Sequence, residues 1–122
     1  MNNYRSGLEE VVAKQLQVLK VPFQYETLKI FYNKPLKKSF YRPDFILPNG
    51  IIIEAKGLFP TADRKKHKLI REQHGSKYDI RFVFSNANTK ISKQSRTTYA
   101  DWCVKHCFPY ASRVVPESWL NE

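Results

Sequence analysis

The sequence predicts an α/β fold in which a mixed β-sheet is flanked by helices. Apolar residues recur at helical spacing in three segments and gather in short β-rich runs in four others, in the order α-β-β-β-α-β-α. A chain of 122 residues is long enough for one hydrophobic core but not for two. We therefore expect residues 1–122 to form a single domain.

The first helix is predicted over residues 7–20. Ser6-Gly7-Leu8-Glu9 has the form of a capping box, and apolar residues follow it at helical spacing: Leu8, Val11, Val12, Leu16 and Leu19. Pro22 ends this helix. Residues 23–32 are rich in Phe, Tyr and Ile, which predicts a strand. The basic connector Asn33–Lys38 is either a loop or an extended bridge to a partner subunit.

A β-hairpin is predicted next, because Pro48-Asn49-Gly50 separates the apolar runs 45–47 and 51–53. Three consecutive Ile residues in the second run suggest a strand buried on both faces, near the middle of the sheet. The remaining elements are a basic helix, a buried strand, a polar loop, a helix and a short final turn, at residues 62–74, 80–84, 85–95, 97–107 and 116–120.

Three polar residues of the hairpin are candidates for a site. With a three-residue loop, Asp44 lies directly opposite Glu54, and Lys56 points to the same face as Glu54. A two-residue Asn49-Gly50 turn would place Asp44 and Glu54 on opposite faces instead. Two adjacent carboxylates repel, and a hard divalent cation such as Mg²⁺ would remove that cost. The ordinary alternative is a surface hairpin that carries common cross-strand ion pairs.

The charge balance favours a polyanionic partner. The chain has 21 Lys and Arg against 11 Asp and Glu, a net charge of +10, and nucleic acid is the commonest polyanion; the alternative is a basic protein that is merely soluble. The longest apolar runs are three residues long, too short for a membrane span, and the start lacks the apolar stretch of a secretory signal. We expect a soluble, intracellular protein without a membrane partner.

Basic residues also cluster locally. The predicted helix 62–74 carries Arg64, Lys65, Lys66, Lys68 and Arg71 around His67, and the polar loop carries Lys90, Lys93 and Arg96. Both clusters, together with Arg5, are candidates for phosphate contacts. A solvated helix face explains many such runs, and a surface position for His67 is the simpler expectation. Three large aromatic residues are expected in the core or an interface: Tyr99, Trp102 and Trp119.

Several motifs together resemble one known family. Pro43-Asp44, nine residues, and Glu54-Ala55-Lys56 match the Pro-Asp…(Asp/Glu)-x-Lys signature of a large nuclease superfamily. In order and spacing, further segments closely resemble the bacteriophage endonuclease I family, the Holliday-junction resolvases of T-odd phages: Arg5-Ser6-Gly7-Leu8-Glu9, Leu47-Pro48-Asn49-Gly50, Gly57-Leu58 and Asp63-Arg64-Lys65-Lys66-His67 through Gln73-His74. The resemblance runs from about Arg5 to Trp119.

The resemblance implies a restriction-endonuclease-like fold and a domain-swapped homodimer. The first helix and first strand would be exchanged between subunits, and residues 33–38 would form the bridge. It implies cleavage of four-way junctions and other branched DNA, with two Mg²⁺ ions per active site, for which Mn²⁺ can substitute, and no small-molecule cofactor. The catalytic set would be Glu9, Asp44, Glu54 and Lys56, and the metal ligands would be Glu9, Asp44, Glu54 and the Ala55 carbonyl. The expected location is the cytoplasm of an infected bacterial host.

Alternatives remain at this point. Glu9 in a capping box could simply cap the first helix rather than bind metal. The same fold could serve a duplex-nicking or homing endonuclease, or a non-catalytic DNA-binding module. Relative to the family, only four residues precede Arg5 and no basic tail follows Glu122, which we expect to weaken junction selectivity or DNA affinity without removing the chemistry.

Overall fold

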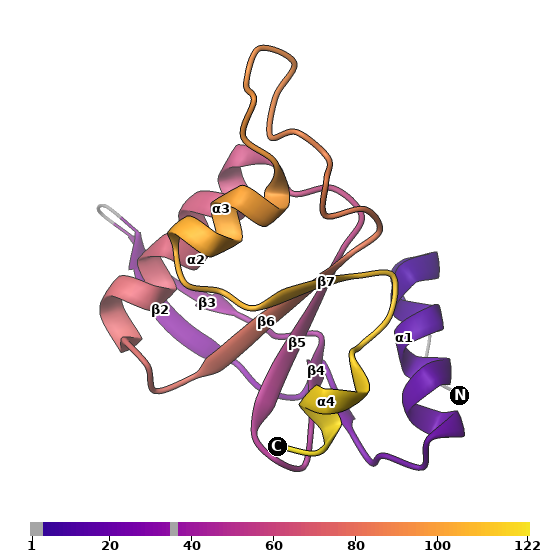
Figure 1. Ribbon diagram of the computed structural model, residues 1–122. Coiled ribbons are helices and arrows are strands. Elements are labelled where there is room, and N and C mark those ends of the chain that lie inside the picture. The colour runs from indigo at the N-terminus through magenta and orange to yellow at the C-terminus, as the bar shows by residue number, and fades with distance from the viewer. Residues whose placement is uncertain (1–3, 35–36) are drawn as a thin grey trace.

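The computed structural model describes residues 4–34 and 37–122, and within them it forms a five-stranded sheet and a separate two-stranded ribbon (Figure 1). The sheet has the order β1-β4-β5-β6-β7, and the ribbon pairs β2 with β3. The strands are β1 Gln24–Tyr25, β2 Ile30–Lys34, β3 Lys37–Tyr41, β4 Phe45–Ile46, β5 Ile51–Lys56, β6 Asp79–Phe84 and β7 Tyr110–Ser112. The helices are α1 Gly7–Val18, α2 Thr61–His74, α3 Tyr99–Lys105 and α4 Glu117–Leu120.

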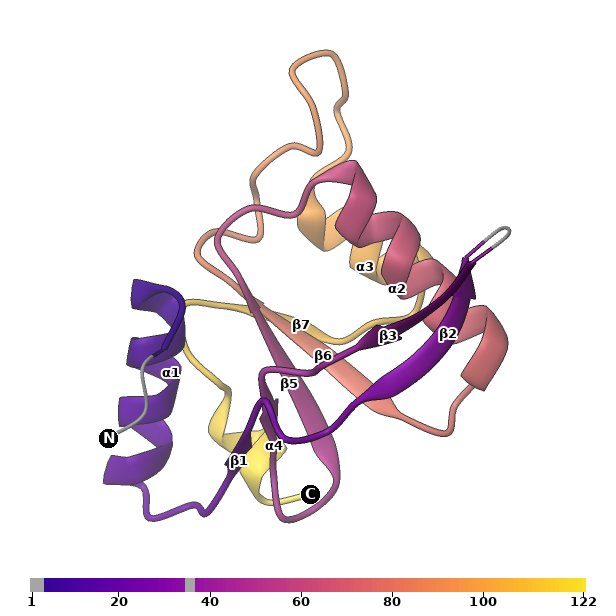
Figure 2. The ribbon, with the colours of Figure 1, turned by 180° about the vertical axis from the view of Figure 1, so that it is seen from behind.

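The sheet is mixed and covered on both faces, as the sequence predicts. β1, β4 and β5 are antiparallel, whereas β5, β6 and β7 run parallel. Ile52 of β5 packs with residues of α2, α3 and the ribbon, while Ile51 and Ile53 pack with residues of α1 and α4. In both views α2 and α3 lie on one side of the sheet, and α1 and α4 lie on the other (Figures 1 and 2). The central Ile run therefore forms the buried middle strand that its composition indicates.

The first helix forms as predicted but ends at Val18. The Ser6 hydroxyl accepts a hydrogen bond from the backbone N–H of Glu9 at 3.1 Å, which is the N-cap half of a capping box. At the other end, Lys20 adopts a left-handed backbone with φ 57°, and the N–H of Val21 donates to the carbonyl of Leu16 at 2.9 Å. The helix therefore closes on its own carbonyls before Pro22 is reached.

The prediction of a single strand over residues 23–32 is wrong. Glu26 has a left-handed φ of 53° and its N–H donates to the Asp44 carbonyl at 3.0 Å, so the chain turns sharply there. The segment divides into β1, which joins the sheet, and β2, which joins the ribbon. This break fixes Asp44 beside the first strand.

The two ends of the predicted connector Asn33–Lys38 belong to paired strands, which the sequence pattern did not indicate. In the ribbon, Phe31 pairs with Phe40 and Asn33 with Lys38. Pro35 and Leu36, in the middle of the expected bridge, lie outside the described residues. Strand β3 was missed because Lys37-Lys38-Ser39 has no β-rich pattern. The structure holds one chain, in which α1 packs on its own β5, so exchange with a second copy stays a prediction.

The predicted hairpin is confirmed in its three-residue form. Phe45 pairs with Ile53 and Ile46 with Ile52, the register that the longer loop requires. The N–H of Leu47 donates to the carbonyl of Ile51 at 2.9 Å. Gly50 has φ +88°, a conformation that glycine adopts without steric cost.

The second half of the chain largely follows the prediction. α2, β6, the polar loop and the short α4 are confirmed, and α3 is shorter than expected because Thr98 and Asp101 form a capping box. The three aromatic residues expected inside are buried: Tyr99, Trp102 and Trp119. β7, a three-residue edge strand, was missed. Among the described residues no helix has the length and apolar character needed to cross a membrane.

Candidate active site

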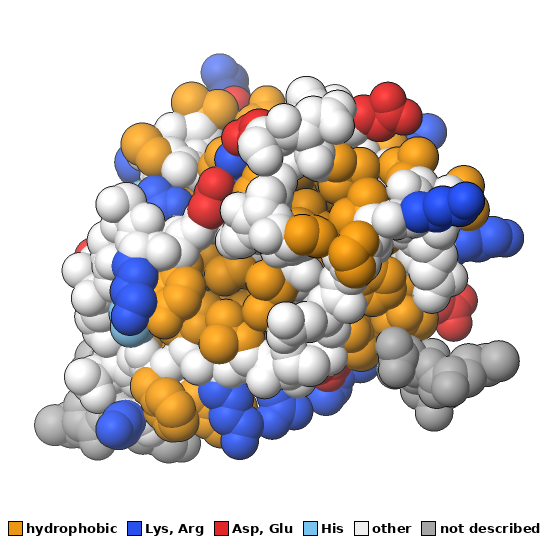
Figure 3. All heavy atoms as spheres, turned by 90° about the horizontal axis from the view of Figure 1, so that it is seen from below, with side chains coloured by type: hydrophobic (Ala, Val, Ile, Leu, Met, Phe, Trp, Pro, Cys, Tyr) orange, Lys and Arg blue, Asp and Glu red, His pale blue; other side chains and the backbone are white. Residues whose placement is uncertain are grey.

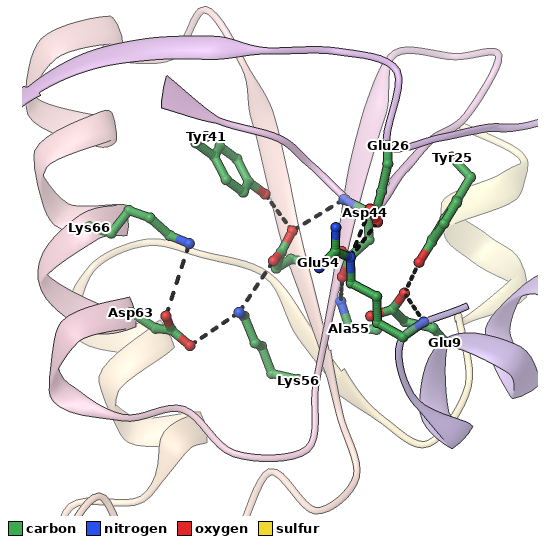
Figure 4. Close-up of polar contacts among 11 residues, drawn as sticks. Glu9, Tyr25, Glu26, Tyr41, Asp44, Glu54, Ala55, Lys56, Asp63 and Lys66 are labelled. Carbon is green, nitrogen blue, oxygen red and sulfur yellow. Dashed lines mark hydrogen bonds and ion pairs between the residues drawn. The ribbon is translucent and has the colours of Figure 1, made fainter. Parts of the chain in front are cut away.

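Asp44 and Glu54 meet at the end of the β4–β5 hairpin (Figure 4). The N–H of Ala55 donates to Asp44 Oδ2 at 2.9 Å, and the N–H of Asp44 lies 3.4 Å from Glu54 Oε2. Asp44 is 8% exposed and Glu54 is 3% exposed. The hairpin register thus places two buried carboxylates side by side, as the sequence predicts for a three-residue loop.

Lys56 joins them from two residues further along β5. Its ammonium nitrogen is 3.4 Å from Glu54 Oε1 and 3.1 Å from Asp63 Oδ2. Asp63 lies in the first turn of α2 and was not among the predicted site residues. No short sequence pattern links it to the hairpin, because the contact depends on how α2 packs against the sheet. Lys56 is held between two carboxylates from different elements.

Two more side chains lie beside these residues. Tyr41, fully buried on β3, donates its hydroxyl to Glu54 Oε2 at 2.6 Å. Lys66, predicted to contact DNA, lies with its ammonium nitrogen 4.0 Å from Asp63 Oδ1 and 5.2 Å from the centre of the Tyr41 ring. Lys66 therefore adds a second cation beside Asp63 (Figure 4). Sequence reasoning missed Tyr41, since a lone Tyr near an acid has no distinctive spacing.

Glu9 approaches from α1 on the other side of Asp44 (Figure 4). It is 6% exposed, and its carboxylate accepts hydrogen bonds from the Tyr25 hydroxyl and, at 3.4 Å, from the backbone N–H of Arg5. The Ser6 side chain alone caps the helix. The carboxylate of Glu9 is therefore directed toward the site rather than committed to closing the capping box.

Burial and neighbouring charges shift the pKa values of Asp44, Glu54 and Lys56. Loss of hydration, and then the nearby charge of Glu54, raise the pKa of Asp44 to about 8, and Glu9 adds to this. Burial likewise raises the pKa of Glu54, against the opposing effect of Lys56. Burial lowers the pKa of Lys56, but Glu54 and Asp63 outweigh it, so the net shift is upward. The site therefore brings together two buried carboxyl groups whose charged forms are disfavoured and a lysine whose charged form is favoured.

These residues fit a hard divalent cation. Carboxylate oxygens are the ligands that Mg²⁺ prefers, and a cation would remove the repulsion that raises the pKa of Asp44. Asp44 uses Oδ2 for the Ala55 N–H, which leaves Oδ1 for another partner. Within residues 4–34 and 37–122, no three His, Cys, Asp or Glu side chains are grouped closely enough to form a complete cage. Water and substrate oxygens would complete the coordination, as is usual for Mg²⁺.

The predicted DNA-contacting residues are placed in three different ways. Arg64 and Arg71 donate to backbone carbonyls, Arg64 to Phe59 at 2.7 Å and Arg71 to Cys107 at 3.2 Å. The guanidinium of Arg5 is exposed and bonded to Glu26 at 2.8 Å. The remaining predicted contacts, apart from Lys66 and His67, are exposed on α2 and the polar loop: Lys65, Lys68, Lys90, Lys93 and Arg96. These five are available to phosphate.

The prediction for His67 is wrong. Its side chain is 0% exposed, with its ring edge-to-face against Tyr41 and Phe82 at centroid distances of 4.9 and 4.8 Å. Neither ring nitrogen has a hydrogen-bond partner in the described structure, and burial lowers its pKa well below the usual value. His67 is a neutral core residue. The prediction failed because the neighbours of His67 in the sequence are basic, whereas its side chain lies on the side of α2 that packs on the sheet.

Comparison with known proteins identifies the family of this chain. The phage endonuclease I family model matches residues 1–122. The chain is 49% identical over 119 residues to "Endonuclease I" of Escherichia phage T7, covering 98% of this chain and 79% of that protein. It is also 49% identical over 119 residues to "Endodeoxyribonuclease 1" of Enterobacteria phage T3, covering 98% and 78% of the two chains. The chain therefore belongs to the phage endonuclease I family.

Proposed function

We propose that this chain is a structure-selective DNA endonuclease that resolves four-way junctions and other branched DNA by metal-dependent phosphodiester hydrolysis. The observation that carries the proposal is the convergence of Asp44, Glu54 and Lys56 at one end of the β4–β5 hairpin. The printed names of the T7 and T3 relatives support DNA cleavage. The net charge of +10 suits a polyanionic substrate.

The residues that would hold metal are Asp44, Glu54 and the Ala55 carbonyl on one side and Glu9 with Asp44 on the other. Two Mg²⁺ ions, or Mn²⁺ in their place, would supply Lewis acidity at the scissile phosphate and neutralise the clustered carboxylates. Tyr41 occupies Glu54 Oε2 and thereby limits the orientations open to that carboxylate. Tyr25 restrains Glu9 in the same way.

Lys56 acts as a cation rather than as a base. Because Glu54 and Asp63 raise its pKa above the ordinary value, it stays protonated at neutral pH. Its N–H groups would donate to a phosphate oxygen and stabilise the charge that develops during hydrolysis. Asp63 holds the ammonium at 3.1 Å and so positions it beside Glu54.

We also propose that the protein acts as a domain-swapped homodimer. Resolution of a junction requires two symmetric incisions, which suits two active sites related by a two-fold axis. The ribbon β2–β3 lies between the part of the chain that carries Glu9 and the hairpin that carries Asp44, so an exchange across it would build each site from two chains (Figure 2). Because the relatives are phage proteins, we place its action in the cytoplasm of an infected bacterium.

Cleavage of a four-way junction should be compared with cleavage of a linear duplex of the same sequence, with Mg²⁺ and with EDTA. We expect Mg²⁺-dependent paired incisions at the junction that leave 5′-phosphates, with little cutting of the duplex, and no cleavage by Asp44→Ala. Sequence-dependent duplex cutting that exceeds junction cutting would favour the duplex-nicking or homing alternative. Junction binding without cleavage in Mg²⁺ or Mn²⁺ would establish the non-catalytic module.

A further inference from the structure

The outer face of the ribbon carries a set of aromatic and basic side chains that the sequence did not single out. Phe31 and Phe40 are paired across the two strands and are 53% and 48% exposed. Paired residues share one face of a sheet, whereas Tyr32 and Tyr41 point inward and are buried. We call this surface the ribbon face, and define it as Lys29, Phe31, Lys38, Phe40 and Arg42.

The basic side chains of the ribbon face lie over its aromatic rings. Lys29 Nζ is 4.9 Å from the centre of the Phe40 ring, and Lys38 Nζ is 5.3 Å from that of Phe31. The guanidinium carbon of Arg42 is 5.8 Å from the Phe40 ring centre. Among the described residues, none of these three cations takes part in an ion pair. Seen from below, Lys and Arg side chains follow one margin of the molecule with hydrophobic groups among them (Figure 3).

The ribbon is held against the body by its edge, which leaves the face open. Gln73 of α2 accepts from the N–H of Asn33 at 2.7 Å and donates to its carbonyl at 2.6 Å. His74 contacts the carbonyl of Phe31 at 2.7 Å through Nε2. These bonds occupy the backbone groups of β2 that would otherwise pair with another strand. Because α2 contacts the backbone edge of β2, it leaves the side chains of the ribbon face uncovered.

We propose that the ribbon face binds unpaired nucleotides of the branched DNA substrate. Proteins that bind single-stranded nucleic acid combine basic side chains along the sugar-phosphate backbone with exposed aromatic rings on which the bases stack. The three unpaired cations of this face would repel the same face of a second copy, so the charge favours DNA over self-association. An exchange of identical segments between two copies would preserve these contacts, so the face does not depend on that exchange.

The ribbon face is close enough to the active site to act on the same substrate molecule. Arg42 lies two residues before Asp44, and Tyr41, on the inner side of the same strand, donates to Glu54. At ~3.3 Å per residue, Phe40 is at most about 13 Å along the chain from Asp44. The inference rests on the proposed function and adds a preference to it: DNA with unpaired nucleotides beside the cleavage point binds better than continuous duplex.

Binding should be measured in EDTA, where the DNA stays intact, with a four-way junction, a duplex that contains a short single-stranded gap, and a continuous duplex. We expect the double variant Phe31→Ala/Phe40→Ala to bind gapped DNA about tenfold more weakly and to bind continuous duplex normally, since one stacked base contributes about a factor of ten. Phe40→Trp should retain the affinity. Lys38→Gln/Arg42→Gln should reduce the slope of log affinity against log salt by about 2 for gapped DNA.

Matched controls come from an exposed helix remote from the ribbon. Val104 of α3 is 66% exposed, and Val104→Ala with Lys105→Gln removes an apolar and a basic group without touching the ribbon face. This control should bind all three DNAs normally. Thermal unfolding would verify that the ribbon variants stay folded.

Three results would overturn the inference. They are normal gapped-DNA binding by both ribbon variants, equal losses for gapped and continuous DNA, and a change of oligomeric state in sedimentation that accounts for the loss. The last result would assign the ribbon face to a second copy of the chain. Failure of the proposed function is separate, because wild-type protein would then fail to cut junctions with Mg²⁺ whatever the ribbon variants do.

Discussion

Strands β5 and β6 each carry a buried charged residue within a cluster of charges, and the two clusters differ in one respect. On β6, Arg81 is 8% exposed and donates to Asp79 at 2.9 and 2.8 Å and to Glu122 at 2.6 and 2.8 Å, with its guanidinium 5.3 Å above the centre of the Trp119 ring. At the β4–β5 hairpin, Glu54 pairs with Lys56 and accepts a hydrogen bond from Tyr41, whereas the Asp44 carboxylate accepts a hydrogen bond from the backbone N–H of Ala55.

The difference is in how completely each charge is matched. The hydrogen bonds that Arg81 donates to Glu122 and Asp79 raise its pKa, so its charged form is favoured in the folded protein. Burial and Glu54 raise the pKa of Asp44 to about 8, so its charged form is disfavoured. A matched cluster of charge stabilises the fold. A cluster of buried carboxyl groups without enough cationic partners lowers the stability of the fold, and a bound cation would offset that loss.

The largest expected effect separates these roles. Asp44→Asn should lower the rate of junction cleavage about a thousandfold, which corresponds to ~4 kcal/mol of transition-state stabilisation. The substitution removes a carboxylate that is proposed to bind the metal ion. It should not lower the stability of the metal-free protein. Asp79→Asn, the matched change in the Arg81 cluster, should leave cleavage unchanged and lower stability. Single-turnover cleavage and urea unfolding measure both, and the reverse pattern would refute the distinction.

A smaller loss is expected at the third acid. Glu9→Gln should lower cleavage about a hundredfold, because the amide keeps the shape of the side chain but weakens its hold on a cation. Ser6→Ala removes the cap that the structure shows, and it should cost ~1 kcal/mol of stability without changing turnover. Near-normal turnover by Glu9→Gln would return Glu9 to a capping role.

The raised pKa of Asp44 predicts a pH dependence. A proton and a cation compete for this carboxylate, so Mn²⁺ affinity should rise up to about tenfold per pH unit below pH 8 and level off above it. Calorimetric titration from pH 6 to pH 9 measures this.

The same pKa affects the metal-free fold. The folded pKa lies above the ordinary value of 3.8, so this contribution to stability is fully present below that pH and is lost as pH rises through about 8. Asp44→Asn should therefore gain stability relative to the wild type over this range. If the free energies of unfolding of the two proteins change with pH in parallel, the pKa of Asp44 is not raised in the folded protein.

The smallest effect concerns the matched cluster. Arg81→Met keeps the stem over Trp119 but removes the bonds to Asp79 and Glu122, and it should cost about 1 kcal/mol because both carboxylates are half exposed. Junction cleavage should not change. Urea unfolding at low and high salt measures the loss, and a cleavage defect larger than the stability loss would show that this cluster also serves the active site.

Local patterns predicted the centre of the fold correctly because short-range rules apply there. Pro48-Asn49-Gly50 between two apolar runs predicted the hairpin, and of the two registers left open the structure has the three-residue loop, which brings Asp44 to Glu54. The Ile run predicted the central strand. The ribbon was missed because β3 is polar along its first residues and pairs through backbone bonds that leave no mark on composition.

His67 shows a different limit. Its neighbours in the sequence are basic, and only the packing of α2 on the sheet decides which side of that helix is buried. Asp63, Tyr41 and Tyr25 were missed for the same reason, because each reaches its carboxylate or ammonium partner from another element.

The sequence by itself determined the mixed α/β class, the position of the β-hairpin, the candidate set Asp44, Glu54 and Lys56, and the family, whereas the hairpin register was settled between two alternatives only by the structure. Each depends on residues close together in the chain or on a pattern of identities. Only the tertiary structure decided that these carboxylates are buried, which tyrosines restrain them, and that the ribbon presents aromatic rings beneath cations. Burial and long-range contacts come from packing between elements, and the pKa of a carboxyl group depends on that packing rather than on its neighbours in sequence.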